Sequence, residues 1–253
     1  MTLSVVGLGK KTCLAIVVVV CSVGLSCGIF SKTAVSPSEF SQDNWLSKAI
    51  TDSEKAGSDL VEAGNTNSGE AGLGIVAASR KDMPAAASAL ASAARQDAES
   101  VAKIIVAVDP ENSTSLGEVV LEAARKDASS MGVVVASAAR DDPRAAGKIV
   151  SLVIDKDAKT AAEIIIVGAK EDSGALGAVL ADCAITDSRK TGAAVAIAAA
   201  NAPELAGAAI SSSLKIDPGS VSDVLLRSSA LDPDATTKAL VSGTFLDPVA
   251  LAL

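Results

Sequence analysis

"DDPRAAGKIVSLVIDKDAKTAAEIIIVGAKED", residues 141–172, contains one pattern twice, and the two copies are fifteen residues apart. In each copy an Asp precedes a small residue or Pro, polar residues, an Ala-Gly or Ala-Ala pair and then aliphatic residues. Steps of fifteen residues carry the pattern from residue 52 to residue 247 without insertion or deletion. A fixed period of this kind is typical of a repeat protein, whose fold follows from the repeat unit.

Aspartate or asparagine occupies thirteen of the fourteen first positions of the repeat, and Ala202 occupies the other. We number each repeat from this residue, as position 0, to position 14. An Asp or Asn side chain caps a helix because its oxygen accepts a hydrogen bond from a free N–H of the first turn. Pro, which occupies position 1 in five repeats, is also favoured at a helix start. The predicted structural caps are Asp82, Asp97, Asp127, Asp142, Asp157, Asp172, Asp187, Asp217, Asp232 and Asp247.

The remainder of each repeat has a helical pattern. Position 8 is aliphatic in all thirteen complete repeats, and positions 4, 8, 11 and 12 place apolar residues on one helix face. Arg and Lys gather near the end of the repeat, where they complement the negative end of the helix dipole. The pattern therefore predicts one helix of about eleven residues per repeat, followed by a turn of about two to four residues.

Glycine occupies position 5 in eight repeats. A Gly inside a helix costs about 0.5–1 kcal/mol relative to Ala, so its repeated use needs a compensating gain. The gain that we expect is close approach of a neighbouring helix. Close helix packing is predicted at Gly117, Gly132, Gly147, Gly177, Gly192 and Gly207.

Two architectures fit the period. In one, consecutive helices run antiparallel and their hairpins stack into an α-solenoid, which resembles HEAT, armadillo and tetratricopeptide arrays in general layout. In the other, one continuous helix forms a supercoil. Pro inside a helix costs about 3 kcal/mol, so the five in-register prolines favour separate helices. The predicted fold class is all-α: a right-handed α-solenoid of short antiparallel helices, preceded by an N-terminal transmembrane or signal helix.

Residues 1–31 differ in composition from the repeats. Lys10 and Lys11 precede an uncharged stretch from residue 12 to residue 31, about the length that crosses a bilayer. The lysines favour an orientation that places the downstream chain outside the cytoplasm. The segment is interpreted as a retained signal-anchor helix, a cleaved signal peptide, or a lipoprotein signal with lipidation at Cys27; a buried core helix is the remaining alternative.

Residues 32–51 are predicted to form a linker and a degenerate N-terminal capping helix, because Trp45 falls in a column that is aliphatic elsewhere. Residues 52–253 form the repeat domain. Its last repeat, "DPVALAL", is incomplete, and we expect an unsatisfied stacking face at this end. The helices between Ala161 and Ala200 carry few charges on any face. They are predicted to be covered by a second copy, another subunit or a bilayer surface, unless their small residues are simply exposed.

The composition excludes several kinds of chemistry. The chain has no His, so imidazole acid–base catalysis, His-based triads and most zinc sites are absent. Cys183 is interpreted as a small core residue, and no phosphate-binding loop or calcium loop is present. No catalytic residue, cofactor or metal site is predicted. The net charge of −8 argues against nucleic acid as a partner.

These observations predict a non-enzymatic, membrane-tethered scaffold or protein-interaction module. We expect it on the periplasmic or cell-surface side of the membrane, or secreted if the signal is cleaved. Its partner, another protein or a second copy, would bind the apolar middle repeats and the C-terminal end. The alternative is a structural subunit that assembles end to end into a filament or surface layer.

Overall fold

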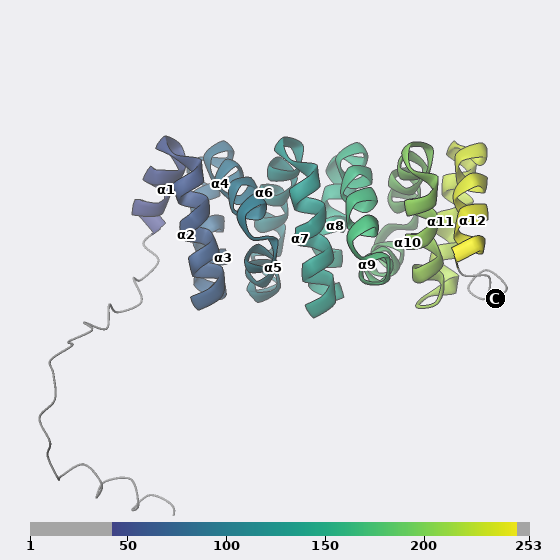
Figure 1. Cartoon of the computed structure of the whole chain (residues 1–253), viewed down its shortest axis with the longest axis horizontal. Helices are drawn as coiled ribbons and strands as arrows, with labels where there is room; N and C mark the ends of the chain where they lie inside the picture. Colours follow the sequence, from purple (N-terminus) through teal and green to yellow (C-terminus); the bar gives the residue numbers. More distant parts are fainter. Residues whose placement is uncertain (1–41, 247–253) are drawn as a thin grey trace, which may run out of the picture. The chain divides into compact units, whose positions relative to one another are not determined.

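The computed structural model describes residues 42–246, which are helical and contain no β-strand (Figure 1). The all-α class is therefore confirmed for this part of the chain. Residues 1–41, with the predicted signal or transmembrane helix and Cys27, lie outside the described residues. The helices are α1 (Gln42–Thr51), α2 (Ser53–Thr66), α3 (Ser68–Ser79), α4 (Met83–Gln96), α5 (Ala98–Ala107), α6 (Ser113–Lys126), α7 (Ala128–Asp141), α8 (Pro143–Lys156), α9 (Ala158–Asn201), α10 (Pro203–Leu214), α11 (Pro218–Leu231) and α12 (Pro233–Leu246).

A typical repeat helix has 14 residues, and a single residue separates it from the next helix. Between α7 and α8 this residue is Asp142, whose φ of −145° and ψ of 94° are extended. The prediction of eleven-residue helices joined by turns of two to four residues is wrong, because one extended residue is enough to turn the chain. Longer connections occur only in places, as between α5 and α6.

Three groups of the bend residue form hydrogen bonds. The Asp142 N–H donates to the Ala138 carbonyl at 2.8 Å, which ends α7. Its carbonyl accepts from the Ala146 N–H at 3.2 Å, and its side-chain Oδ1 accepts from the Ala145 N–H at 3.0 Å. One residue thus terminates one helix and caps the next, so few backbone groups at the bend remain without a partner.

Two further bends lie inside α9. Asp172 (φ −155°, ψ 94°) and Asp187 (φ −156°, ψ 91°) have the same extended backbone as the other bend residues. Residues 158–171, 173–186 and 188–201 therefore form three repeat helices, and the period of fifteen continues through this element.

From α2 to α10, the helices pack mainly on helices two places away in the chain, so they form two parallel rows. In one row α2 contacts α4, α4 contacts α6 and α6 contacts α8; in the other α3 contacts α5 and α5 contacts α7. Figure 1 shows the helices of residues 42–246 following one another in one direction. The two rows bury a continuous core of small aliphatic residues, with position 8 fully buried at Leu60, Ile75 and Leu90.

The position 5 glycines lie where a helix meets the helix two places on. A Cβ atom on Gly177 would lie 2.9 Å from the backbone of Ser212 and Ser213, closer than real Cβ contacts. Gly192 and Gly207 likewise face backbone atoms of the opposite helix. Gly117, Gly132 and Gly147 lie nearest to side chains instead, of Leu152, Val167 and Asp182. At three of the six predicted sites, therefore, glycine allows backbone to approach backbone.

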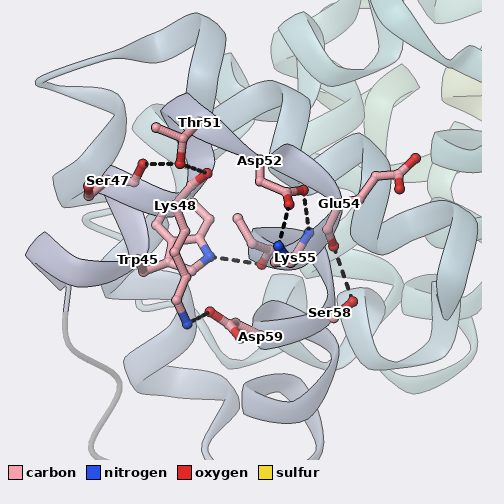
Figure 2. Close-up of polar contacts among 10 residues, drawn as sticks. Trp45, Ser47, Lys48, Thr51, Asp52, Glu54, Lys55, Ser58 and Asp59 are labelled. Atoms are coloured by element: carbon pink, nitrogen blue, oxygen red, sulfur yellow. Dashed lines mark hydrogen bonds and ion pairs between the residues drawn. The ribbon is translucent and has the colours of Figure 1, made fainter.

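Helix α1 covers the beginning of the stack (Figure 2). Trp45 is only 2% exposed, and its Nε1–H donates to the Ala56 carbonyl at 2.9 Å. Lys48 forms an ion pair with Asp59 at 2.8 Å. The indole fills the column that aliphatic residues fill in later repeats, and its one polar group has a partner in α2.

The apolar helices between residues 161 and 200 are buried mainly by their own neighbours. Ile164, Ile165, Leu176, Val179 and others in this range are at most a few per cent exposed. A helix in this stack has neighbours in its own row on two sides and in the other row on a third, so most of its circumference is covered. Burial of these residues does not require an external partner. Within residues 42–246, no helix is both long enough and apolar enough to span a bilayer.

The glycine contacts predict opposite effects for two substitutions in the same helical segment. Gly177→Ala should lower the free energy of unfolding by about 1–3 kcal/mol, because the added methyl overpacks the contact with Ser212. Gly174→Ala should raise it by about 0.5 kcal/mol, because the nearest atom lies 3.4 Å away and Ala favours the helix. Urea unfolding followed by circular dichroism measures both. Equal effects of the two variants would contradict close packing at position 5.

Ala202 predicts a stabilising substitution. It has the extended backbone of a bend residue (φ −149°, ψ 73°) but makes no side-chain cap hydrogen bond. Ala202→Asp should raise the free energy of unfolding by about 1 kcal/mol, because the carboxylate can accept from the first turn of α10. Ala202→Asn keeps the acceptor without the charge and is the matched control. An unchanged or lowered stability of both variants in thermal unfolding would show that the bend does not depend on the cap.

Candidate interaction surface

Nine of the ten predicted caps lie among the described residues, and each side chain accepts a backbone N–H of the following helix. Asp247, like Cys27, lies outside them. The acceptors, with the donor residue and distance, are Asp82 (Ala85, 3.0 Å), Asp97 (Glu99, 3.0 Å), Asp127 (Ser130, 3.0 Å), Asp142 (Ala145, 3.0 Å), Asp157 (Thr160, 3.1 Å), Asp172 (Ala175, 2.9 Å), Asp187 (Lys190, 3.0 Å), Asp217 (Ser220, 3.1 Å) and Asp232 (Ala235, 2.9 Å). These carboxylates cap the helices and so support the fold.

Three of the caps also bind an arginine that lies 32 residues earlier in the chain. The pairs are Arg95 with Asp127 at 3.2 Å, Arg125 with Asp157 at 3.1 Å, and Arg140 with Asp172 at 3.1 Å. In each pair the arginine is at position 13, at the end of one helix, and the aspartate begins the third helix after it. We call these pairs the arginine ladder.

The hydrogen bonds of the ladder aspartates lower their pKa. The Thr160 N–H lowers the pKa of Asp157 and the Ala175 N–H that of Asp172; the arginines act in the same direction, and partial burial opposes both. At Asp127, burial raises the pKa, but the hydrogen bonds from Ser130 and Arg95 outweigh it. All three carboxylates are therefore ionised at neutral pH.

Cys183 is the one cysteine among the described residues. Cys183 is buried, and burial raises the pKa of its thiol to about 12, so the thiol stays protonated at neutral pH. It lies beside a cleft of about 420 Å³ between α6, α8 and α9, where an ion pair joins Lys190 and Asp155. No group of three or more potential metal-binding side chains occurs in residues 42–246.

The most distinctive surface lies at the C-terminal end of the stack. From α2 to α10, position 5 is buried in every repeat helix, and position 9 is buried or half-buried, because the helix two places on covers them. In α11 and α12 both positions are exposed. We define the C-terminal face as positions 5, 8, 9 and 12 of these two helices: Ser222, Leu225, Leu226, Ser229, Thr237, Leu240, Val241 and Thr244.

The eight residues of this face are uncharged, four of them aliphatic and four of them hydroxyl residues. Leu226 is 68% exposed and Val241 is 49% exposed. Three of its four hydroxyl groups donate to carbonyls of their own helices: Ser222 to Pro218 at 2.6 Å, Thr237 to Pro233 at 2.7 Å, and Thr244 to Leu240 at 2.8 Å. Since these donors already have partners, an apolar surface can cover them without leaving a hydrogen bond unmade.

The opposite side of the stack has a different chemistry. Position 5 of one helix meets position 10 of the helix two places on, so positions 3 and 10 face the N-terminal side. In α2 these are Lys55 and Glu62, which are exposed, and position 3 of α3 is the exposed Glu70. The N-terminal side is thus charged, as expected for a solvated capping surface.

Comparison with protein-family models, with curated proteins and with solved structures gives no match for this chain. The function is therefore inferred from the surface of the described residues.

The incomplete last repeat predicts an unsatisfied face at this end but does not identify the residues of that face. The available signal was the loss of Gly and Ala at position 5, where Ser222 and Thr237 stand in the last two complete repeats. Ser and Thr are larger than Gly and Ala, so they are less suited to the closest helix contacts. The two helices that carry them at position 5, α11 and α12, are those that no described helix covers.

The ladder predicts a pH-dependent contribution to stability. The folded pKa values of Asp127, Asp157 and Asp172 are below the ordinary value of 3.8. Their contribution is therefore present above pH 3.8 and is lost as the pH falls through the folded pKa values. The triple variant with Asn at these positions keeps cap acceptors but no charge, so it should be about 1–2 kcal/mol less stable than wild type at pH 7.

Urea unfolding at pH 7 and at pH 2 measures this difference, which should become small at pH 2. Glu163→Gln, on an exposed face of α9, is the control and should change stability by less than about 0.5 kcal/mol at either pH. A difference between wild type and the triple variant that is the same at both pH values would contradict the role of the charges.

Proposed function

We propose that the chain is a non-enzymatic, membrane-tethered scaffold outside the cytoplasm, built as a right-handed α-solenoid of antiparallel helices that presents the C-terminal face to a protein partner. The observation that carries this proposal is the exposure of Leu226 and Val241 at positions covered in every earlier helix. Clustered apolar residues on an exposed surface are characteristic of interaction sites.

The distribution of apolar residues supports a site at this end of the stack. Of the seven large apolar residues that are exposed between residues 44 and 244, four lie in its last part: Ile216, Leu226, Leu231 and Val241. The middle repeats, by contrast, are covered by neighbouring helices. We therefore expect the partner to bind at the C-terminal end of the stack.

A scaffold role agrees with the chemistry of the described residues. Their carboxylates at the bends cap helices, their one thiol is buried and protonated, and the basic side chains of the ladder form ion pairs. Catalysis would need a nucleophile, a base or a metal with access to solvent.

The membrane tether rests on the sequence of residues 1–31. Lys10 and Lys11 before an uncharged stretch place the repeats outside the cytoplasm by the positive-inside rule. A retained helix, or acylation at Cys27 after cleavage, would hold the repeats at the membrane. Cleavage without acylation would release them.

The filament alternative requires the C-terminal face of one copy to meet the N-terminal side of the next. That contact would place the exposed Glu62 against Leu226, and burying a charge against an aliphatic surface is costly. The alternative therefore has less support than a scaffold with one apolar end.

The tether is tested by fractionating cells that produce the full chain with a C-terminal epitope tag. The full chain should sediment with membranes, and protease added outside the cytoplasmic membrane should remove the tag. A chain that lacks residues 1–31 is the matched control and should remain soluble and protected. A full chain that remains soluble and protected in the cytoplasm would overturn the proposed location. Intact mass of wild type and Cys27→Ser then distinguishes a retained, a cleaved and an acylated N-terminus.

A further inference from the structure

The connection between α5 and α6 is the longest in the described part of the chain. Helix α5 has 10 residues instead of the usual 14, because Pro110 occupies position 13, where a full-length repeat helix has its last turn. Asp109, Pro110 and Glu111 are exposed. The chain therefore forms a short surface loop here, and this loop ends at Asn112.

Asn112 is the last residue before α6 and differs from the other Asp and Asn residues at position 0. Its backbone is helical (φ −96°, ψ −7°) rather than extended, and its side chain makes no cap hydrogen bond. Every other Asp or Asn at position 0 from residue 52 to residue 232 accepts such a bond, including Asn67, which accepts from the Glu70 N–H at 3.4 Å. The Asn112 N–H instead donates to the Asp109 carbonyl at 2.9 Å, and its carbonyl accepts from the Leu116 N–H at 3.0 Å. The fold therefore holds Asn112 by its backbone and does not use its side chain as a cap.

The sequence at this side chain is an acceptor pattern for N-linked glycosylation. Asn112, Ser113 and Thr114 follow the rule Asn-x-Ser/Thr, in which x is any residue except Pro. The chain contains five Asn residues, and only Asn112 has a hydroxyl residue two places after it. Thr114, which supplies that hydroxyl, is exposed, and Asn112 is partly exposed. The acceptor pattern and an accessible side chain that caps no helix thus occur at the same residue.

We propose that Asn112 is glycosylated, with a sugar chain on its Nδ2 atom. This inference rests on the proposed function, because such acceptor patterns are used on exported proteins. The sugar donor is a lipid-linked oligosaccharide pyrophosphate, on which a transferase outside the cytoplasm acts. The Nδ2 atom bonds to the anomeric carbon of the first sugar as the bond from that carbon to the pyrophosphate oxygen breaks. The lipid pyrophosphate leaves with the electron pair, and Nδ2 loses one proton to a base of the transferase.

The folded chain has room for a sugar chain at this place. Attachment at Nδ2 removes no cap hydrogen bond, because Asn112 makes none. The Ser113 Oγ–H donates to the Pro110 carbonyl at 2.6 Å, so the loop keeps its own hydrogen bond beside the sugar. Helix α6 packs on α3, α4, α7, α8 and α9, well before α11 and α12 in the stack (Figure 1). The sugar would therefore lie away from the C-terminal face and leave that face open to a partner.

Mass spectrometry of the tagged full chain, purified from its own cells and their medium, tests the modification. The peptide that contains Asn112 should carry the mass of a sugar chain, and an amidase that removes N-linked sugars should leave an aspartate at position 112. Asn112→Gln and Thr114→Ala should each abolish the modification, because the first removes the acceptor and the second removes the hydroxyl that the transferase requires. Thr114→Ser keeps a hydroxyl and is the matched control, which should retain the sugar. Asn67→Gln changes an Asn outside the pattern and should also retain it.

An unmodified Asn112 in the exported wild-type chain would overturn the proposal, as would a sugar that persists in Asn112→Gln or Thr114→Ala. Complete loss of the sugar in Thr114→Ser or Asn67→Gln would show that the acceptor pattern does not determine the modification, and would also overturn it. The chain that lacks residues 1–31 should carry no sugar, and a sugar on it would overturn the dependence on export. Failure of the location is distinguishable from these results. An exported chain without the sugar overturns only the modification, whereas a full chain that remains in the cytoplasm overturns the location as well.

Discussion

Most bends of the chain depend on one residue, usually an aspartate, that hydrogen-bonds to both of the helices it joins. Its N–H ends one helix, its carbonyl continues the hydrogen bonding of the next, and its carboxylate caps that next helix. Because a single residue performs all three roles, there is no loop between most helices. The spacing of the helices, the rows they form and the contact of each helix with the one two places on all follow from this tight turn.

Much of this architecture could be predicted from the sequence, because the cap chemistry repeats at a fixed interval. The helix starts are visible in Asp142 and Asp157, since a cap followed by Pro or a small residue has a direct physical meaning. The helix ends are not visible in the same way. Residues such as Arg140 and Asp141 are polar because they are exposed on the last turn, and exposure alone does not distinguish a last turn from a loop.

Burial was harder to predict than helix position. An amphipathic pattern assumes that a helix has one buried face, whereas a helix in this stack has neighbours on three sides. Apolar residues of the middle repeats that seemed to need an external cover, such as Ile164 and Val179, are therefore buried by the chain. The candidate surface shows the reverse: Leu226 and Val241 follow the same pattern as their counterparts in earlier repeats, but no described helix covers them. The sequence pattern describes a repeat, but exposure depends on which neighbours it has.

The one-residue bend also has a consequence for how such a chain can change in length. A residue added within a helix would rotate everything after it by about 100° about the helix axis and would turn its buried stripe away from the core. With no loop at most bends to absorb the addition, a viable insertion or deletion must be a whole helix of fifteen residues. If each later helix is to stay in its own row, two helices, or thirty residues, must be added or removed together. This constraint explains why no smaller insertion occurs between residue 52 and residue 247.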